Sequence, residues 1–115
     1  MSEEKYVVAD FSAIVPVPCP CGMSRRAYIE ESGHEVSFHV VDIKVDAQYH
    51  YHKEHSEIYY ILEGEGFLEL DGGKIPVKPG ISVLIKTGCR HRAIGNLKVI
   101  NVSMPAFDPT DEYFD

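Results

Sequence analysis

Hydrophobic and polar positions along the chain alternate with the period of two residues that is typical of β-strands. From Val36 onward this alternation recurs in β-branched and aromatic runs, and no window has sustained apolar residues at the i, i+3, i+4 and i+7 spacing of an amphipathic helix. The pattern predicts strands at residues 26–31, 36–46, 49–52, 57–62, 66–70, 74–77, 82–85, 91–94 and 97–103. We therefore expect an all-β chain.

Turn-forming residues separate the predicted strands. Asp71-Gly72-Gly73 lies between two alternating runs and predicts a tight hairpin, because aspartate and glycine reach the positive φ values that such turns require. Further turns are predicted at Gly64-Glu65-Gly66, Pro79-Gly80 and Gly95-Asn96. Many short strands at this spacing predict a sandwich or a barrel, and a barrel leaves no exposed sheet edge.

The two ends of the chain differ from its centre. Residues 1–22 include prolines at alternate positions, Pro16, Pro18 and Pro20, which predict an extended N-terminal arm. Residues 105–115 mix turn formers, acids and three aromatic rings, so we expect a C-terminal tail that docks its rings on the barrel or on a partner. Residues 1–115 are expected to form a single domain.

Composition and charge narrow the possible partners. The chain has 115 residues, with 44% hydrophobic and 25% charged residues, as in an ordinary globular protein. Its formal net charge of -7 disfavours binding to nucleic acid and to anionic membranes. The N-terminal residues lack the pattern of a secretory signal, and no apolar run approaches the length of a membrane span, so a cytoplasmic location is expected. Cys19, Cys21 and Cys89 are expected to be reduced thiols.

A cluster of histidines marks a candidate metal site. In a strand, His50 and His52 point to the same face, about 7 Å apart along it, so both imidazoles can reach one ion. Glu57 begins the next predicted strand and His91 begins a later one, which completes a set of three imidazoles and one carboxylate. This set suits a divalent transition metal, and Fe, Mn, Ni, Cu and Zn all remain open. His34 and His39 have no such partners, and His55 is interpreted as a loop residue.

Two motifs carry a resemblance to a known family. His50-x-His52-(x4)-Glu57-(x6)-Gly64 and Gly80-(x5)-Lys86-x-Gly88-(x2)-His91 resemble the two motifs of the cupin superfamily. Lys44, Lys86 and Asn96 depart from the usual pattern, and none of them removes a metal ligand. The resemblance implies a double-stranded β-helix, or jelly roll, of six to eight strands with the metal inside the barrel mouth. It also implies a homodimer.

Other candidate site residues follow from strand parity and charge. If Glu57 faces inward, Tyr59 does too, which makes Tyr59 a candidate pocket wall or proton donor. Arg25 and Arg26 are candidates to hold an anionic substrate group at the barrel mouth.

The leading functional prediction is a metal-dependent, dioxygenase-like enzyme that acts on a small anionic molecule. A decarboxylase, a sugar-phosphate or keto-acid isomerase, and a non-catalytic metal-dependent binding or sensing module remain alternatives.

Overall fold

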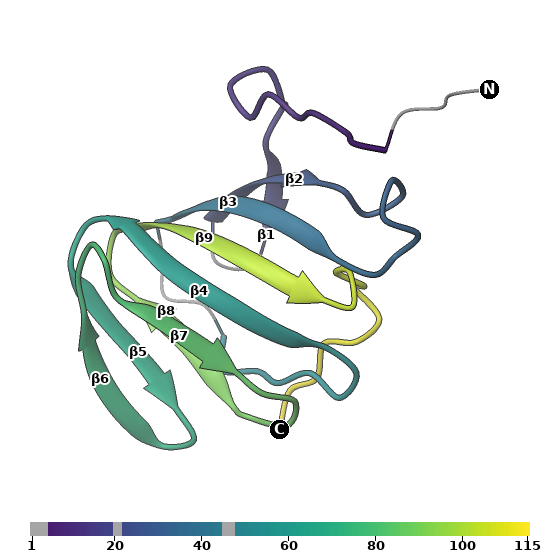
Figure 1. The fold of residues 1–115 in the computed structure, drawn as a ribbon. Helices are drawn as coiled ribbons and strands as arrows, with labels where there is room; N and C mark the ends of the chain where they lie inside the picture. The colour runs from purple at the N-terminus through teal and green to yellow at the C-terminus, as the bar shows by residue number, and fades with distance from the viewer. Residues whose placement is uncertain (1–4, 20–21, 45–47) are drawn as a thin grey trace.

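The computed structural model describes residues 5–19, 22–44 and 48–115, which form strands, turns and irregular segments without a helix (Figure 1). The strands are β1 (Val17–Cys19), β2 (Gly22–Ala27), β3 (Ser37–Ile43), β4 (Ser56–Glu63), β5 (Gly66–Leu70), β6 (Gly73–Val77), β7 (Ser82–Ile85), β8 (His91–Ile94) and β9 (Leu97–Met104). The all-β prediction is therefore confirmed. None of the described residues belongs to a helix long and apolar enough to cross a membrane.

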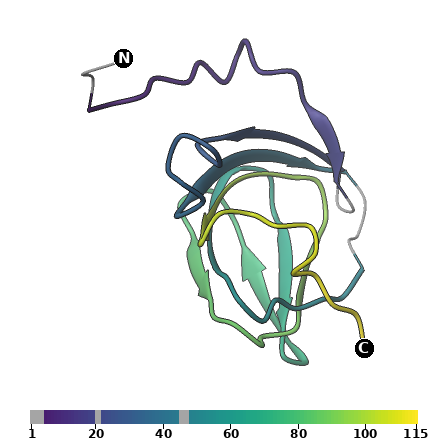
Figure 2. The ribbon, with the colours of Figure 1, turned by 90° about the vertical axis from the view of Figure 1, so that its right-hand side faces the viewer.

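The strands form two antiparallel sheets. One sheet has six strands in the order β1-β2-β3-β9-β4-β7, and the other has three in the order β6-β5-β8. The chain crosses between the sheets, and the strands curve around a common interior in the view of Figure 2. This is the jelly-roll barrel that the sequence predicted.

The inner faces of the two sheets meet in an apolar core. β3 shows the reason most clearly, because its residues alternate strictly between buried and half-buried, as expected when one face of a strand is inside. Buried side chains from both sheets make up the core: Val41, Ile43, Tyr59, Ile61, Leu68, Val77, Ile85, Ala93, Leu97 and Val99. Burial of this apolar surface is the main force that holds the sheets together.

The inner face of the six-stranded sheet changes from apolar to polar along the strands. One cross-strand row consists of Val41, Val99 and Ile61, which pair in register on β3, β9 and β4. The next inward-facing row consists of Arg26, His39, Asn101 and Tyr59, and the one after it of Ser37, Ser103 and Glu57. The barrel interior is therefore mainly apolar at one end and polar at the other. The polar end contains the candidate site.

Two predicted strands differ from the observed ones. The strand expected at residues 26–31 is instead β2, which ends at Ala27, because a tight turn follows with Tyr28 at φ 76° and His34 at φ 65°. Ser32 stabilises this turn, since its hydroxyl accepts the backbone N–H of Val36 at 3.1 Å. The segment at 49–52 makes two isolated bridges in place of a strand.

The terminal segments make different contacts with the barrel. Residues 5–14 lie outside the barrel in both views and contact it through Phe11, whose ring lies 5.4 Å from that of Phe38, and through the carbonyl of Ile14, which accepts Nε–H of Arg25 (Figures 1 and 2). The C-terminal tail returns to the barrel, where Tyr113 forms a bridge with Tyr51 and stacks on its ring. Pro20 and Cys21 of the predicted arm lie outside the described residues.

Gly64 provides a test of the tight packing between the β4–β5 turn and β9. Its φ is +90°, and a Cβ at this position would lie 2.2 Å from the backbone oxygen of Asn96. Gly72 has a similar φ of +84°, but a Cβ there would meet nothing within 4 Å. Both alanine variants bear the left-handed backbone penalty of about 1–2 kcal/mol, so their difference isolates the clash.

We expect Gly64→Ala to lower the free energy of unfolding by at least about 2 kcal/mol more than Gly72→Ala does. Urea denaturation followed by circular dichroism measures both variants. Equal losses of unfolding free energy in the two variants would show that the turn accommodates the added methyl group without a clash.

Candidate metal centre

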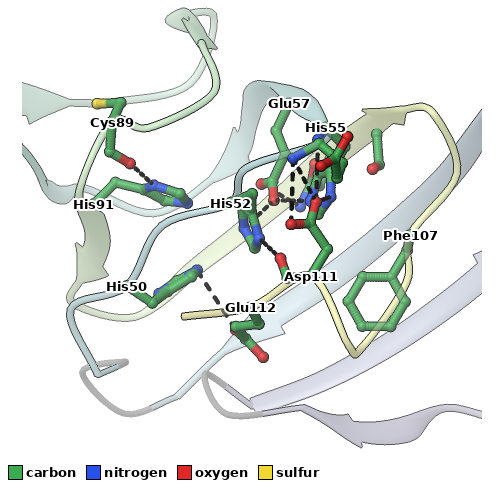
Figure 3. A network of polar contacts seen from close by, with 12 residues as sticks. His50, His52, His55, Glu57, Cys89, His91, Phe107, Asp111 and Glu112 are labelled. Carbon is green, nitrogen blue, oxygen red and sulfur yellow. Dashed lines mark hydrogen bonds and ion pairs between the residues drawn. The ribbon is translucent and has the colours of Figure 1, made fainter. Parts of the chain in front are cut away.

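Three imidazoles meet at the polar end of the barrel. His50 and His52 lie in the segment before β4, and His91 opens β8. The backbones of His50 and His91 pair with each other, with N···O distances of 3.1 and 2.8 Å, so the two rings are placed side by side. Each of the three residues offers a nitrogen within 4.8 Å of the others, and Figure 3 shows the rings together.

Hydrogen bonds to the backbone determine which nitrogen of each ring is available. The Nδ1 atom of each ring lies 2.6–2.8 Å from a carbonyl oxygen, and the acceptors are those of Gln48, Asp111 and Cys89. A carbonyl can only accept, so Nδ1 carries the proton and the Nε2 of a neutral ring keeps its lone pair. The Nε2 atoms of His52 and His91 are buried and have no hydrogen-bond partner. These unpaired acceptors fit a metal ion.

Glu57 adds a carboxylate beside the imidazoles. Its Oε1 lies 2.7 Å from Nε2 of His52, and its Oε2 accepts a hydrogen bond from Nδ2 of Asn101 at 3.0 Å. The contact between Glu57 Oε1 and Nε2 of His52 lacks the alignment of a hydrogen bond. A neutral His52 would therefore face the carboxylate with its lone pair. A second proton or a cation between the two atoms would relieve this repulsion, and a metal ion meets that requirement.

Burial and charge shift the protonation of these groups. Burial opposes ionisation of Glu57, but contacts with His52 and His55 outweigh it and hold the pKa of the carboxyl well below its usual range. Burial also opposes charge on His52, and the Glu57 carboxylate outweighs it and raises the pKa of the imidazole. Burial lowers the pKa of His91 to about 4, so this ring is neutral at pH 7. A neutral imidazole is the form that binds metals.

Asp111 in the C-terminal tail holds this cluster in place. Its carboxylate accepts the backbone N–H groups of Lys53, Glu54 and His55 at 2.9–3.1 Å. These bonds, with the Nδ1 of His55 at 2.8 Å, outweigh burial and lower the pKa of Asp111. The carbonyl of the same residue accepts Nδ1–H of His52. Asp111 therefore fixes both the segment between the ligands and the orientation of one of them.

His55 is a buried link rather than an exposed loop residue. It is 2% exposed, and its two ring nitrogens lie 2.8 Å from Asp111 Oδ2 and 3.1 Å from Glu57 Oε1. His55, His52 and Asp111 form a second group of potential metal ligands. The contacts of His55 are those of a hydrogen-bonded chain from the tail to Glu57, so this group supports the first one. His55 lies in the loop before β4, as the sequence suggested, but its contact with Asp111, 56 residues away, is visible only in the structure.

A cavity extends from this cluster along the polar rows of the barrel. The side chains that line it beyond His50, His52 and Glu57 include Ser24, Arg26, His39, Tyr59, Asn101, Phe107 and Glu112. Among them, Glu112 lies beside His50, with Oε1 3.6 Å from Nε2 of that ring (Figure 3). The ring of Tyr59 lies 6.3 Å from that of His91. Metal-binding side chains and a small-molecule pocket are therefore adjacent.

The two arginines that the sequence singled out take different positions. Arg26 lines the cavity, with its guanidinium carbon 4.4 Å from the centre of the Phe107 ring. Arg25 donates Nε–H to the carbonyl of Ile14 and makes a loose 3.8 Å pair with Asp42, away from the cavity lining. Consecutive residues of a strand face opposite sides, so only one of two neighbouring arginines can point inward.

Sequence reasoning missed several of these residues. His39 lines the cavity 2.7 Å from Ser37 Oγ, and burial together with the Arg26 charge lowers the pKa of His39 to about 4. Asp111, Glu112 and Asn101 carried no motif signal. Cys89 acts through its carbonyl on His91, while Cys19 lines the cavity. For His39 and Asn101 the sequence offered one signal, which is the strand alternation that places both side chains on the inner faces of β3 and β9.

Comparison with solved structures supports the fold. A protein from Planctomyces limnophilus superposes with a TM-score of 0.89 at 37% identity, over 98% of this chain and 100% of that one. Pac13, a nucleoside dehydratase from Streptomyces, superposes with a TM-score of 0.76 at 16% identity, over 97% of this chain and 90% of that one. At that lower identity the likeness concerns the fold alone.

Comparison by sequence identifies the family. L-ectoine synthase from Halomonas elongata is 45% identical over 60 residues, which cover 50% of this chain and 44% of that protein. The chain spans about half the length of the curated relatives it matches. The family model described as "Cupin domain" matches residues 38–102, which include the three imidazoles and Glu57. The chain therefore belongs to the cupin family.

Proposed function

We propose that this cupin is a metal-dependent enzyme that binds one divalent transition metal through His50, His52, Glu57 and His91. The observation that carries the proposal is the set of three imidazoles whose Nδ1–H groups are all donated to backbone carbonyls. Their Nε2 lone pairs are left for a cation, and Glu57 adds a negative charge beside them. Fe, Mn, Ni, Cu and Zn all accept such ligands.

The cavity next to this cluster is proposed to bind a small anionic substrate. A bound metal would supply Lewis acidity at the end of the cavity where the imidazoles lie. Arg26 holds an anionic group at the other side, since its guanidinium is the one arginine or lysine charge among the described lining residues. The Glu112 carboxylate lines the cavity beside His50 and is proposed to accept a proton, and Tyr59 forms part of the wall.

The reaction is proposed to be non-oxidative, with proton transfer as its central step. Glu112 supports this choice, because a carboxylate on the cavity wall outside the proposed ligands provides a base. The name of a relative that is 45% identical over 60 residues, L-ectoine synthase, describes a synthase. Dioxygenase activity, the leading prediction from the sequence, stays the second candidate, and a non-catalytic binding module the third. The homodimer stays a prediction that analytical ultracentrifugation tests.

Metal content tests the proposed ligands directly. The His52→Ala, His91→Ala double variant should fall from about one metal ion per chain to nearly none, because it removes two of the four ligands. Inductively coupled plasma mass spectrometry of untagged protein measures this, and circular dichroism should stay β-rich. His34→Ala is the control, since His34 is exposed and pairs only with Glu30 among described residues. Full metal content in the double variant would refute the site.

Asp111 is expected to act as a positioning residue for the metal centre. Asp111→Ala leaves three backbone N–H groups and the ring of His55 without their acceptor, so we expect a loss of about 2–4 kcal/mol in unfolding free energy. Metal affinity should fall roughly 10- to 100-fold, as for other partners of ligating histidines. Asp108→Ala, in the same tail but bonded only locally to Thr110, should change neither quantity appreciably. Unaltered affinity in Asp111→Ala would contradict this role.

Turnover separates the three functional candidates. The Fe, Mn, Ni and Zn forms are each incubated with a panel of small carboxylates and monitored by an O2 electrode and mass spectrometry. We expect product without O2 uptake, and a loss of at least about tenfold in kcat for Glu112→Gln if this carboxylate accepts the proton. Product that contains oxygen from O2 would establish the dioxygenase, and binding without product would establish the binding module.

A further inference from the structure

Three buried polar atoms on the cavity wall have no hydrogen-bond partner among the residues that the structure describes. They are Ser24 Oγ, Arg26 Nε and Asn101 Oδ1, and each belongs to a residue that lines the cavity. The other unpaired buried side-chain atoms among the described residues are Nε2 of His52 and His91, which belong to the proposed metal centre. An unpaired buried polar atom is costly, and its usual explanation is a functional one. All five atoms therefore gather around one site.

Strand pairing positions these three atoms along two neighbouring rows. Ser24 and Arg26 are two residues apart on β2, so both point to the inner face. Asn101 on β9 shares a cross-strand row with Arg26, separated from it by His39 on β3. Adjacent strands are about 4.8 Å apart, so the α-carbons of Arg26 and Asn101 are separated by about 10 Å. A molecule of a few heavy atoms spans the gap between their side chains.

Arg26 is held in position without a counterion. Its guanidinium lies over the Phe107 ring, which fixes the plane of the group but leaves its charge unneutralised. The described residues provide no salt-bridge partner for it. The other charged groups of the lining, Glu57 and Glu112, are carboxylates. One cation opposite two carboxylates favours a ligand with a single negative charge over a dianion.

The orientation of Asn101 is set by its other partner. A carboxylate only accepts, so the Asn101 atom 3.0 Å from Glu57 Oε2 must be the amide nitrogen. The amide oxygen is thereby left as the unpaired atom on the cavity wall, and it can only accept. Ser24 contributes a hydroxyl that either donates or accepts. The wall therefore requires a ligand with an anionic acceptor for Arg26 and a donor for Asn101.

We propose that Arg26, Ser24 and Asn101 bind a small monocarboxylate that also carries a hydroxyl or amino group. The carboxylate is held by Arg26 and Ser24, and the hydroxyl or amino group donates to Asn101 Oδ1. This inference rests on the proposed function only in taking the cavity as the substrate pocket, and it names the substrate class that the pocket selects.

Stability separates a binding role from a structural one. Ser24 and Ser37 are both almost fully buried on neighbouring strands, but Ser37 Oγ accepts the N–H of Phe107 whereas Ser24 Oγ is unpaired. Without ligand, Ser37→Ala should lower the melting temperature by several degrees, while Ser24→Ala and Arg26→Met should leave it unchanged or raise it. Melting temperatures of Ser24→Ala or Arg26→Met as low as that of Ser37→Ala would overturn the proposal.

Binding tests the chemical class. Protein as purified and protein incubated with zinc are each titrated with L-lactate, L-alanine, propionate and L-lactamide by isothermal titration calorimetry. The wild type should bind lactate or alanine roughly tenfold more tightly than propionate, which lacks the donor, and than lactamide, which lacks the charge. Arg26→Gln should abolish the preference over lactamide, and Asn101→Ala the preference over propionate. Arg92→Gln, on β8 in a pair with Glu69, is the control and should keep both preferences.

Each outcome bears on the proposal. Lack of binding by all four probes, or preferences that persist in Arg26→Gln and Asn101→Ala, would overturn it. The two hypotheses fail separately. If metal analysis finds no bound ion but the charge and donor preferences depend on Arg26 and Asn101, the proposed metal chemistry fails and this inference stands.

Discussion

The structure depends on one arrangement, in which three buried imidazoles each donate Nδ1–H to a backbone carbonyl. The acceptors come from Gln48, two residues before the first ligand, from the C-terminal tail and from the turn before β8. Because the acceptors are main-chain atoms of the barrel, each ring keeps one tautomer and one orientation as long as the fold persists. The preorganisation of the candidate metal centre is therefore a property of the backbone, and side-chain chemistry alone does not produce it.

The C-terminal tail completes that arrangement. Asp111 closes the segment between the ligands by accepting three backbone N–H groups, and it supports Glu57 through His55. A carboxylate buried in this way is tolerated because nearly every hydrogen bond it can accept is made. The same tail places Glu112 in the cavity lining, beside His50. A short C-terminal segment thus links the stability of the barrel to the geometry of its candidate site.

The barrel separates stability from recognition along its length. Apolar rows such as Val41, Val99 and Ile61 bury surface at one end, while the adjacent rows contain polar side chains that face the cavity. Three polar atoms that face the cavity, on Ser24 beside the apolar row and on Arg26 and Asn101 in the next row, are unpaired among the described residues, which lowers the stability of the free protein and favours a ligand that pairs them. The donor or acceptor character of each unpaired atom therefore defines which polar group a bound ligand must present to it.

The sequence by itself determined the strands, the family and the candidate metal ligands. Alternation of apolar and polar residues identifies a half-buried strand from local sequence. His50, His52 and Glu57 lie within eight residues, so they can be recognised as candidate metal ligands without knowledge of the fold. The inward position of Arg26 rather than Arg25, the burial of His55, and the roles of Asn101 and Asp111 were decided only by the tertiary structure. Each depends on strand register or on a contact 44 to 59 residues away. Local sequence carries no record of such pairings, because they arise only when the sheets close around a common core.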